Sequence, residues 1–329
     1  MLNLEFETGK LWYPPRVHSL AARINMKKRP YSQFVGPRYW PTWLGLGILR
    51  ALSFLPLPLI ALLGSGVGFL FYILGRSRRR IAFKNVKSCF PELSDSDCRR
   101  ISRAHFLYAG QVVFSSSMNW WVSKTRFNRW VTVTNREFYD QALESGQNII
   151  LLTPHFLALE VSGIYLSQER AMATMYQYSK NTLIDEVVKR GRLRFGGELV
   201  ERKEPLRKLL KLIRKGHPFI YLPDQDAGRK GVFVPFFHEQ ASTIPMLGKF
   251  VSMTNATVIP CYTRIKPWGR GYEVVFKAPM ENFPVGDDIA DTTHMNNIIE
   301  QMVRENPEQY FWAHKRFKTR PAGEAKFYN

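Results

Sequence analysis

The chain has 329 residues, 45% of them hydrophobic, enough for one large globular domain or two small ones. Its formal net charge of +20 is extreme, and half of it comes from residues 1–80, where twelve Lys and Arg face two Asp and Glu. Such segments bind nucleic acid or anionic membrane surfaces. The three cysteines are scattered and form no C-x-x-C pair, which is typical of reduced thiols in the cytosol and argues against a disulfide framework.

The beginning of the chain is basic and aromatic. Residues 1–10 are polar and include two glutamates, so no secretory signal peptide is expected. Residues 11–42 mix Pro, Arg and aromatic side chains, a combination common at membrane interfaces. They lack the alternation that a strand-like RNA-binding platform requires. The composition therefore favours a membrane partner, and no nucleic-acid partner is expected.

One long stretch, Ala51–Gly75, contains no charged residue. As a helix it could cross a hydrocarbon core of about 30 Å. However, Pro56 and Pro58 interrupt the run, and arginines flank both of its ends, which draws both ends to the cytoplasmic side of a membrane. The pattern favours a bent or hairpin insertion, or one helix lying shallowly in the interface. A buried core helix is the alternative.

From residue 128 onward, short β-rich runs alternate with helical periods, which predicts an α/β fold with a central, largely parallel sheet flanked by helices. We expect two regions: a basic leader with a membrane-associated apolar helix or helical hairpin at residues 1–80, and an α/β domain at 81–329. The predicted strands are Val131–Thr134, Ile149–Leu152, Ala173–Gln177, Glu198–Glu201, Pro218–Leu222, Ala256–Arg264 and Tyr272–Lys277. The predicted helices are 136–145, 155–167, 182–194, 204–215, 242–254 and 291–305.

The first candidate site follows the second predicted strand. Thr153 is a good N-cap and Pro154 a good first helical residue, so a helix is expected to begin near His155. Glu160 follows His155 by five residues, which is not the spacing of one helical face, so the two meet only if His155 lies at or before the first turn. There the helix dipole would oppose protonation of His155, and Glu160 would fix its tautomer. A surface histidine and a solvated glutamate are the alternative.

The second candidate site follows the strand predicted at Pro218–Leu222. Its loop contains Asp224, Gln225 and Asp226, which in isolation indicate turn chemistry or, more weakly, a metal site. The apolar segment Val232–Phe237 comes next and suits either a lipid-tail slot or a plain core strand. The small residues of Glu239–Thr243 are expected to open a helix.

These motifs together resemble one family. The H-x4-E motif of His155 and Glu160 is similar to the H-x4-D/E box of the glycerolipid acyltransferase superfamily. The Asp224–Gly228 and Val232–Phe237 segments resemble its late, or secondary, lauroyl/myristoyl acyltransferases of lipid A biosynthesis. Three further stretches carry the same likeness: Asn85–Ser94, Tyr178–Arg192 and Pro307–Pro321. The likeness runs in order from about residue 40 to Pro321.

The resemblance implies transfer of a lauroyl or myristoyl chain from acyl carrier protein to a hydroxyl of a Kdo-bearing lipid A precursor. It also implies the cytoplasmic face of the cell inner membrane. Acyl carrier protein is acidic, so the basic surface would have it as a second partner beside the membrane. No metal and no organic cofactor are expected, since a thioester already carries an activated acyl group.

The resemblance also implies roles for individual residues. His155 would be the general base and Glu160 its carboxylate partner, with free backbone N–H groups at the helix start as candidates for the oxyanion. Asp224, Gln225 and Asp226 would form a substrate-binding loop. Five cations are candidate partners for acceptor phosphates, because Arg in particular forks onto phosphate oxygens. They are Arg190, Arg192, Arg316, Lys318 and Arg320; a solvated basic face is the alternative.

Two other functions stay open at this point. One is a lysophospholipid acyltransferase, from which the Asp224-Gln225-Asp226 loop would distinguish this chain. The other is a non-enzymatic protein that binds membrane or nucleic acid through charge alone and makes no use of His155. The length of the acyl chain and the position of the acceptor hydroxyl are not fixed by these motifs.

Overall fold

The computed structural model describes residues 29–328, so the predicted basic leader up to Lys28 lies outside the described residues. The strands of the described part are β1 (Val131–Thr134), β2 (Asn148–Leu152), β3 (Ala173–Tyr176), β4 (Glu198–Glu201), β5 (Phe219–Tyr221), β6 (Val232–Phe236), β7 (Glu239–Thr243), β8 (Ala256–Ile265) and β9 (Tyr272–Phe276). Its α-helices are α1 (Trp40–Leu52), α2 (Leu57–Leu74), α3 (Arg76–Cys89), α4 (Asp95–Trp121), α5 (Lys124–Asn128), α6 (Glu137–Glu144), α7 (Leu159–Ser167), α8 (Thr182–Leu193), α9 (Leu206–Arg214), α10 (Leu247–Thr254) and α11 (Asp288–Glu305).

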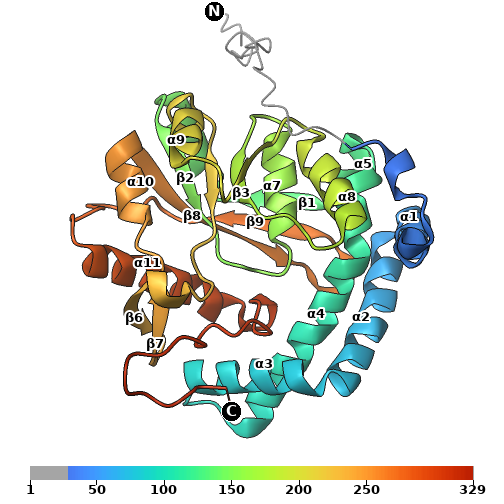
Figure 1. Cartoon of the computed structure of the whole chain (residues 1–329), viewed down its shortest axis with the longest axis horizontal. Coiled ribbons are helices and arrows are strands. Elements are labelled where there is room, and N and C mark those ends of the chain that lie inside the picture. The colour runs from blue at the N-terminus through green and yellow to red at the C-terminus, as the bar shows by residue number, and fades with distance from the viewer. Residues whose placement is uncertain (1–28, 329) are drawn as a thin grey trace, which may run out of the picture.

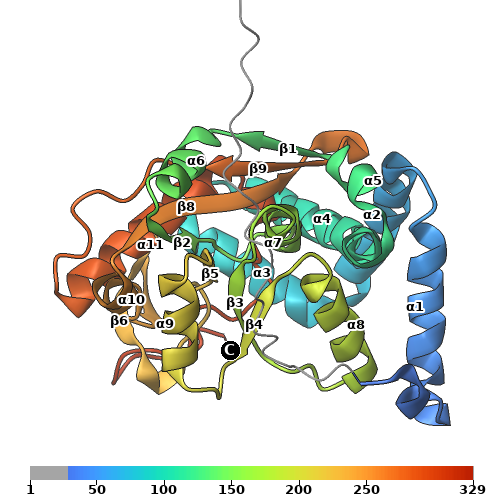
Figure 2. The same ribbon diagram turned by 90° about the horizontal axis from the view of Figure 1, so that it is seen from above.

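A seven-stranded sheet in the order β1-β9-β8-β2-β5-β3-β4 is the centre of the fold (Figures 1 and 2). All neighbouring strands run parallel except β8 and β9. Side chains of β2 alternate between the two faces. Ile150 and Leu152 join a core with residues of α9, α10 and α11, whereas Ile149 and Leu151 join a second core with residues of α6 and α7. The predicted fold class, a largely parallel sheet flanked by helices, is therefore confirmed.

The predicted strands agree with the observed ones to within a residue or two at each end, and two local predictions are wrong. The segment Glu239–Thr243 does not open a helix; it is β7, which pairs antiparallel with β6 in a separate hairpin. This pairing makes Val232–Phe236 a strand, and its buried members Val234 and Phe236 belong to the core. The helix expected from residue 155 begins only at Leu159, so the residues around His155 form a non-helical loop.

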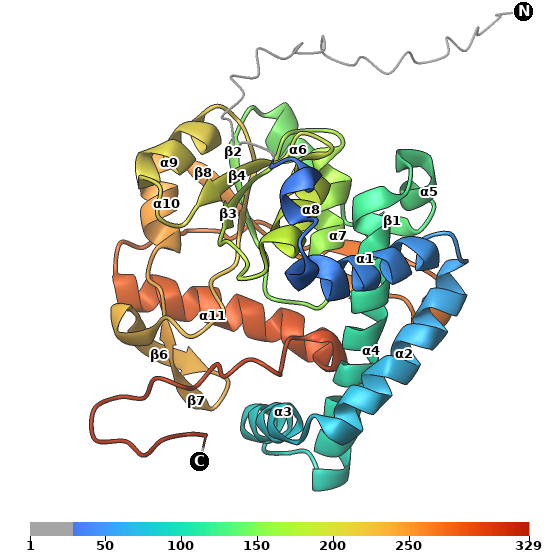
Figure 3. The same cartoon turned by 45° about the vertical axis from the view of Figure 1, so that its right-hand side comes forward.

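Most of the uncharged run forms one helix, α2, and its first two residues are the last of α1 (Figure 3). α1 ends at Leu52, and α2 begins at Leu57 with Pro56 as its N-cap and Pro58 in its first turn, where proline is tolerated. α2 has 18 residues and is the one helix between residues 29 and 328 that is long and apolar enough to cross a membrane; 28% of it is buried. The run is thus bent, and most of α2 is not covered by protein.

The buried side of α2 lies along α4 (Figures 1 and 3). The two backbones approach so closely that a Cβ atom at Gly64 would lie 2.7 Å from Cα of Gln111. Gly68 faces the backbone of Phe106, and Gly110 faces Gly64 across the same contact. Because only glycine fits at these positions, α2 is joined to the α/β domain by a tight helix pair. The predicted division at residue 80 stays a prediction.

Candidate active site

His155 lies in the loop between β2 and α7. Two residues before it, Thr153 donates its backbone N–H to Tyr221 of β5 at 2.9 Å, which continues the parallel pairing of β2 and β5 beyond the strand ends. The segment from Gln309 to Phe311 holds the other side of this loop. Leu157 N donates to Gln309 O at 2.9 Å, and Phe311 N donates to His155 O at 3.0 Å. The His155 backbone is therefore fixed from two directions.

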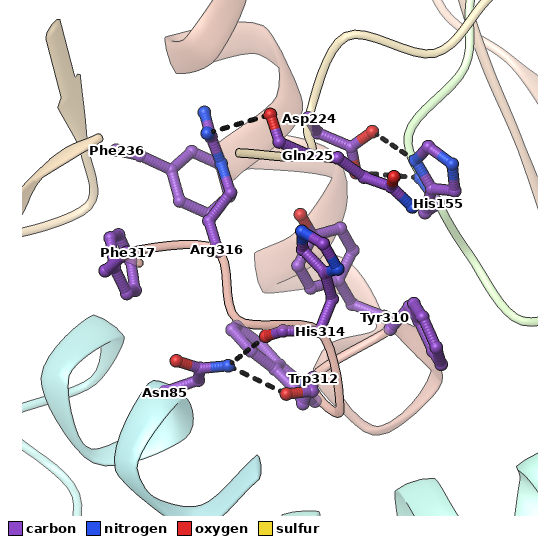
Figure 4. A pocket seen from close by; sticks show the side chains of 11 residues that line it. Asn85, His155, Asp224, Gln225, Phe236, Tyr310, Trp312, His314, Arg316 and Phe317 are labelled. Atoms are coloured by element: carbon purple, nitrogen blue, oxygen red, sulfur yellow. Dashed lines mark hydrogen bonds and ion pairs between the residues drawn. The ribbon is translucent and has the colours of Figure 1, made fainter. Parts of the chain in front are cut away.

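Asp224 lies in the loop after β5 and is the carboxylate that contacts His155 (Figure 4). Its Oδ1 lies 2.6 Å from His155 Nδ1, and its Oδ2 accepts the backbone N–H of His155 at 2.8 Å. The Asp224 side chain is fully buried, whereas the His155 side chain is 21% exposed. This arrangement directs Nδ1 toward the carboxylate and leaves Nε2 as the ring nitrogen available to a substrate.

The electrostatics of the pair favour a charged imidazolium beside a carboxylate. Burial opposes protonation of His155, but the charge of Asp224 and its hydrogen bond outweigh burial, so the pKa of His155 is raised. Burial also opposes ionisation of Asp224, yet the charge and hydrogen bonds of His155 and the charge of Arg316 keep the pKa of this carboxyl below its usual value. The predicted influence of a helix dipole is absent here, because α7 begins four residues after His155.

Glu160 contacts Arg192 instead of His155, so its predicted role as the carboxylate partner of His155 is wrong. Arg192, near the end of α8, donates from Nε to Glu160 Oε2 at 3.0 Å and from Nη2 to Oε1, which makes a two-pronged ion pair. Burial opposes the charge of Arg192, but Glu160 outweighs it and raises the pKa of Arg192. Helix α8 approaches α4 closely here, since a Cβ at Gly191 would lie 2.4 Å from the ring of Trp120, and this glycine helps to position Arg192.

The backbone N–H groups expected to serve an oxyanion are occupied. His155 N donates to Asp224, Phe156 N to Pro154 O at 2.7 Å, and Leu157 N to Gln309 O. These three groups precede α7 and have internal partners, so they are not free donors, and the prediction of oxyanion donors at the helix start stays a prediction. Arg192 is the cation that lines the larger cavity beside His155.

Arg316 is a buried structural residue and does not present its charge to solvent. It is 3% exposed and donates from Nη1 to Gln225 O at 3.2 Å (Figure 4). The same nitrogen donates to Ser242 O at 2.7 Å. Its guanidinium lies 5.2 Å from the centre of the Phe236 ring. Arg316 therefore joins the Asp224 loop to the β6–β7 hairpin, and the prediction that it contacts an acceptor phosphate is wrong.

The other predicted cations also have internal partners, with one exception. Arg190 donates to Glu186 Oε1 at 2.7 Å and to Arg29 O at 2.6 Å, which ties α8 to the first described residues. Arg320 pairs with Glu239 at 3.1 Å and Glu324 at 2.6 Å. Lys318 is exposed. Phosphate binding by Arg190 or Arg320 would require these contacts to open.

The other two residues of the predicted loop, Gln225 and Asp226, have different environments. Asp226 accepts from Thr319 N at 3.0 Å and from Thr319 Oγ1 at 2.9 Å, while its own N–H donates to His314 Nε2 at 3.3 Å. Gln225 is exposed, and its backbone oxygen accepts the hydrogen bond from Arg316 Nη1 (Figure 4). Asp226 thus anchors the C-terminal motif and Asp224 orients His155, while Gln225 faces solvent. Substrate binding by this loop stays a prediction.

An apolar cavity of about 320 Å³ extends from His155 between α7, α8 and strands β3, β4 and β5. One face of α7 forms a wall of this cavity. The ion pair of Glu160 with the Arg192 guanidinium is at the first turn of α7, the end nearer to His155, and Ser167 lines the cavity at the other end of the helix. The residues lining it are His155, Leu159, Glu160, Gly163, Ile164, Ser167, Met172, Thr174, Met175, Gln177, Arg192, Gly197, Leu199, Ile220 and Leu222.

Several residues around the pair were not predicted from the sequence. Tyr310 is buried, and burial together with the charge of Asp224 raises its pKa. His314 faces the Asp226 backbone, and burial lowers its pKa, with a further decrease from the charge of His155. His105 is buried behind the site beside Phe311, where burial lowers its pKa to about 4. Tyr310 and His314 belong to the Pro307–Pro321 motif, which was a usable signal; His105 carries none.

The chain is similar to known proteins over most of its length. Residues 27–319 match the model of the bacterial lipid A biosynthesis acyltransferases. The lipid A biosynthesis lauroyltransferase of Escherichia coli K12 is 35% identical and aligns over 87% of this chain and 94% of its own length. The palmitoleoyltransferase of the same organism is 32% identical, over 90% and 97%. Its myristoyltransferase is 30% identical, over 90% and 93%.

A histidine and an aspartate at the carboxyl ends of parallel strands, beside an apolar cavity, are thus found in a chain whose relatives are acyltransferases. The chain belongs to the bacterial lipid A biosynthesis acyltransferases. The family resemblance and the predicted enzyme class are confirmed.

Proposed function

We propose that this chain transfers a lauroyl or myristoyl group from acyl carrier protein to a hydroxyl of a Kdo-bearing lipid A precursor, at the cytoplasmic face of the cell inner membrane. The observation that carries the proposal is the His155–Asp224 pair at one end of an apolar cavity. A base that accepts a proton and a slot for an alkyl chain are the two elements that acyl transfer to a hydroxyl requires.

The chemistry follows from the orientation of the imidazole. Asp224 accepts the hydrogen bond of Nδ1–H, so Nε2 takes the proton of the acceptor hydroxyl as its oxygen attacks the thioester carbonyl. The imidazolium that forms is stabilised by the buried Asp224 carboxylate. When the tetrahedral intermediate collapses, the carbon–sulfur bond breaks and the proton on His155 passes to the leaving thiolate. The ester product and the carrier thiol then separate.

In this proposal the two substrates occupy different parts of the site. The acyl chain of the donor lies in the cavity along α7, because its walls beyond Glu160 and Arg192 are mainly apolar. The acceptor hydroxyl approaches the exposed edge of His155. The acidic carrier protein would be attracted by the net charge of +20, an effect that acts on association rate and weakens with salt.

Membrane binding is assigned to α2. Its uncovered side presents large apolar side chains: Leu59, Leu62, Leu63, Phe69, Leu70, Phe71, Ile73 and Leu74. Arg79 at the start of α3 donates to Tyr72 O at 2.6 Å and Ile73 O at 2.9 Å and so caps the end of α2. Arginines next to an apolar helix fit a membrane surface rich in anionic lipid.

The acyl transfer is tested in cells and in solution. Lipid A from a strain that lacks the gene is expected to have lost one or more secondary acyl chains by mass spectrometry, and the wild-type gene should restore them. His155→Ala should not restore them. Purified wild-type protein should use lauroyl or myristoyl carrier protein with the precursor. Activity with a lysophospholipid acceptor and none with the lipid A precursor would contradict the proposal.

The membrane assignment needs substitutions rather than truncation, because removing α2 would uncover its glycine contacts with α4. Leu62→Glu with Phe71→Glu places two charges on the uncovered side of α2 and should release the protein from vesicles containing anionic lipid in a flotation assay. Val285→Glu, at an exposed apolar residue before α11, is the control and should stay bound. High salt alone should not release the wild type, since apolar burial is not screened.

A further inference from the structure

The middle of the cavity is shaped by one glycine of α7. Gly163 lies one turn after Leu159 and Glu160 and one turn before Ser167, and all four residues line the cavity. At about 1.5 Å per residue, the wall from Leu159 to Ser167 is about 12 Å long, with Gly163 at its midpoint. An acyl chain whose carbonyl lies at His155 and which follows α7 must pass Gly163 before it reaches Ser167 and Met172.

The space beside Gly163 is limited by Ile220 of β5. A Cβ atom built at Gly163 would lie 3.3 Å from Ile220 Cδ1, which is tighter than an ordinary carbon contact. The contacted atom is the tip of a flexible side chain rather than backbone. A methyl group at residue 163 would therefore occupy cavity space and press Ile220, without a clash against the backbone of the sheet.

Helix propensity gives no reason for glycine at this position. Gly163 lies inside α7, where glycine is about 0.8–1.0 kcal/mol less favourable than alanine. It makes no close backbone approach of the kind seen at Gly64 or Gly110, where a Cβ atom would meet the backbone of a neighbouring helix. The absence of a side chain at Gly163 instead leaves space in the cavity.

We propose that Gly163, together with Ile220, determines how long an acyl chain this enzyme accepts, because the two residues set the width of the cavity midway along α7. This inference rests on the proposed function, in which the cavity holds the acyl chain of the donor. The relatives named for lauroyl, palmitoleoyl and myristoyl transfer are 35%, 32% and 30% identical to this chain, so overall similarity does not assign the length.

The test compares donors that differ only in acyl length. kcat/KM is measured with decanoyl, lauroyl, myristoyl and palmitoyl carrier proteins and a common acceptor. Gly163→Ala should lower the ratio of kcat/KM for a longer donor to kcat/KM for decanoyl carrier protein by about tenfold. This is the effect of about one methylene in an apolar pocket. Ile220→Val removes the Cδ1 atom, and combined with Gly163→Ala it should restore use of the longer donors.

Gly47→Ala is the matched control, since this helical glycine of α1 has open space around its Cβ position and the same substitution should leave the donor profile unchanged. Thermal unfolding checks that each variant is folded. An unchanged ratio of long to short donors in Gly163→Ala, or an equal loss for every donor, would overturn the inference. Wild-type protein inactive with all four donors would instead contradict the proposed function.

Discussion

Two carboxylates near His155 have opposite surroundings. Asp224 follows β5 in the sheet, is 1% exposed, and accepts both the ring and the backbone N–H of His155. Glu160 is in the first turn of α7, its side chain is 29% exposed, and both of its oxygens are bonded to Arg192. The residue closer in sequence to the histidine is thus the one that does not contact it.

The difference follows from the direction of the strands. β2 and β5 are parallel neighbours, so the loops after them emerge at the same edge of the sheet, where residues 69 positions apart in sequence meet. Glu160 belongs to a helix that begins at Leu159 and turns its first-turn side chains toward α8 and the cavity. Asp224 therefore orients His155, whereas Glu160 pairs with Arg192 at the cavity.

The largest expected effect is at Asp224. Asp224→Asn should keep the shape of the loop but stabilise the wrong tautomer of His155 and leave the imidazolium without its counter-charge, so kcat should fall about 10³–10⁴-fold. Asp226→Asn is the matched control: it alters the contact with Thr319 and should change kcat far less. Steady-state kinetics with a saturating acyl donor measures both. Near-normal turnover of Asp224→Asn would show that the charge of Asp224 does not support His155 during catalysis.

The next effect is on stability and concerns Arg316, which joins the Asp224 loop to the hairpin. Arg316→Lys removes donors that buried carbonyl groups require and should cost about 1–3 kcal/mol in the free energy of unfolding. The KM for the lipid A precursor should not change in the folded fraction. Chemical denaturation and acceptor titration separate the two quantities. A raised acceptor KM at unchanged stability would restore the phosphate-binding interpretation.

A smaller effect is expected at Glu160. Glu160→Gln keeps hydrogen-bonding capacity toward Arg192 but loses the charge, so kcat/KM should fall about tenfold, near the weaker end of the effects of losing a charged hydrogen bond. Arg192→Lys, which loses the two-pronged geometry, should have a similar effect, and the double variant should be no worse than either single one. Additive losses would mean that the two residues act independently.

Much of the fold could be predicted because it depends on local patterns. The strand at Ile149–Leu152 is a short apolar run, and the alternation of such runs with helical periods indicates a parallel sheet. The predicted start of α7 is wrong because Thr153 and Pro154, which are common at helix starts, fit an extended loop equally well. In this loop the backbone N–H of Thr153 bonds to Tyr221 O. Glu239–Thr243 was misassigned because its partner strand, β6, decides its conformation.

The site was predicted less completely than the fold, for a physical reason. His155 is recognisable from its place after a strand, and the loop of Asp224 was found by the same rule. Which carboxylate contacts the ring depends on the strand order β2-β5, which no spacing in the sequence contains. Arg316 lies in a basic motif, and charge alone does not distinguish a buried arginine that bonds carbonyl groups from one that faces a phosphate.

The smallest expected effect is a shift in pH dependence, and it distinguishes the two carboxylates most directly. In the proposed mechanism His155 acts in its neutral form, so kcat/KM should rise with pH and level off above the pKa of His155, which is raised by Asp224. In Asp224→Asn the raising charge is gone and burial remains, which lowers the pKa, so the midpoint of the residual activity should move to lower pH. Glu160→Gln should leave the midpoint where it is in the wild type, because the charge of Glu160 is matched by Arg192. Single-turnover measurements with enzyme in excess make the weak activity of Asp224→Asn measurable. If the midpoint moved in Glu160→Gln and stayed fixed in Asp224→Asn, the partner of His155 would be Glu160, the carboxylate nearer in sequence.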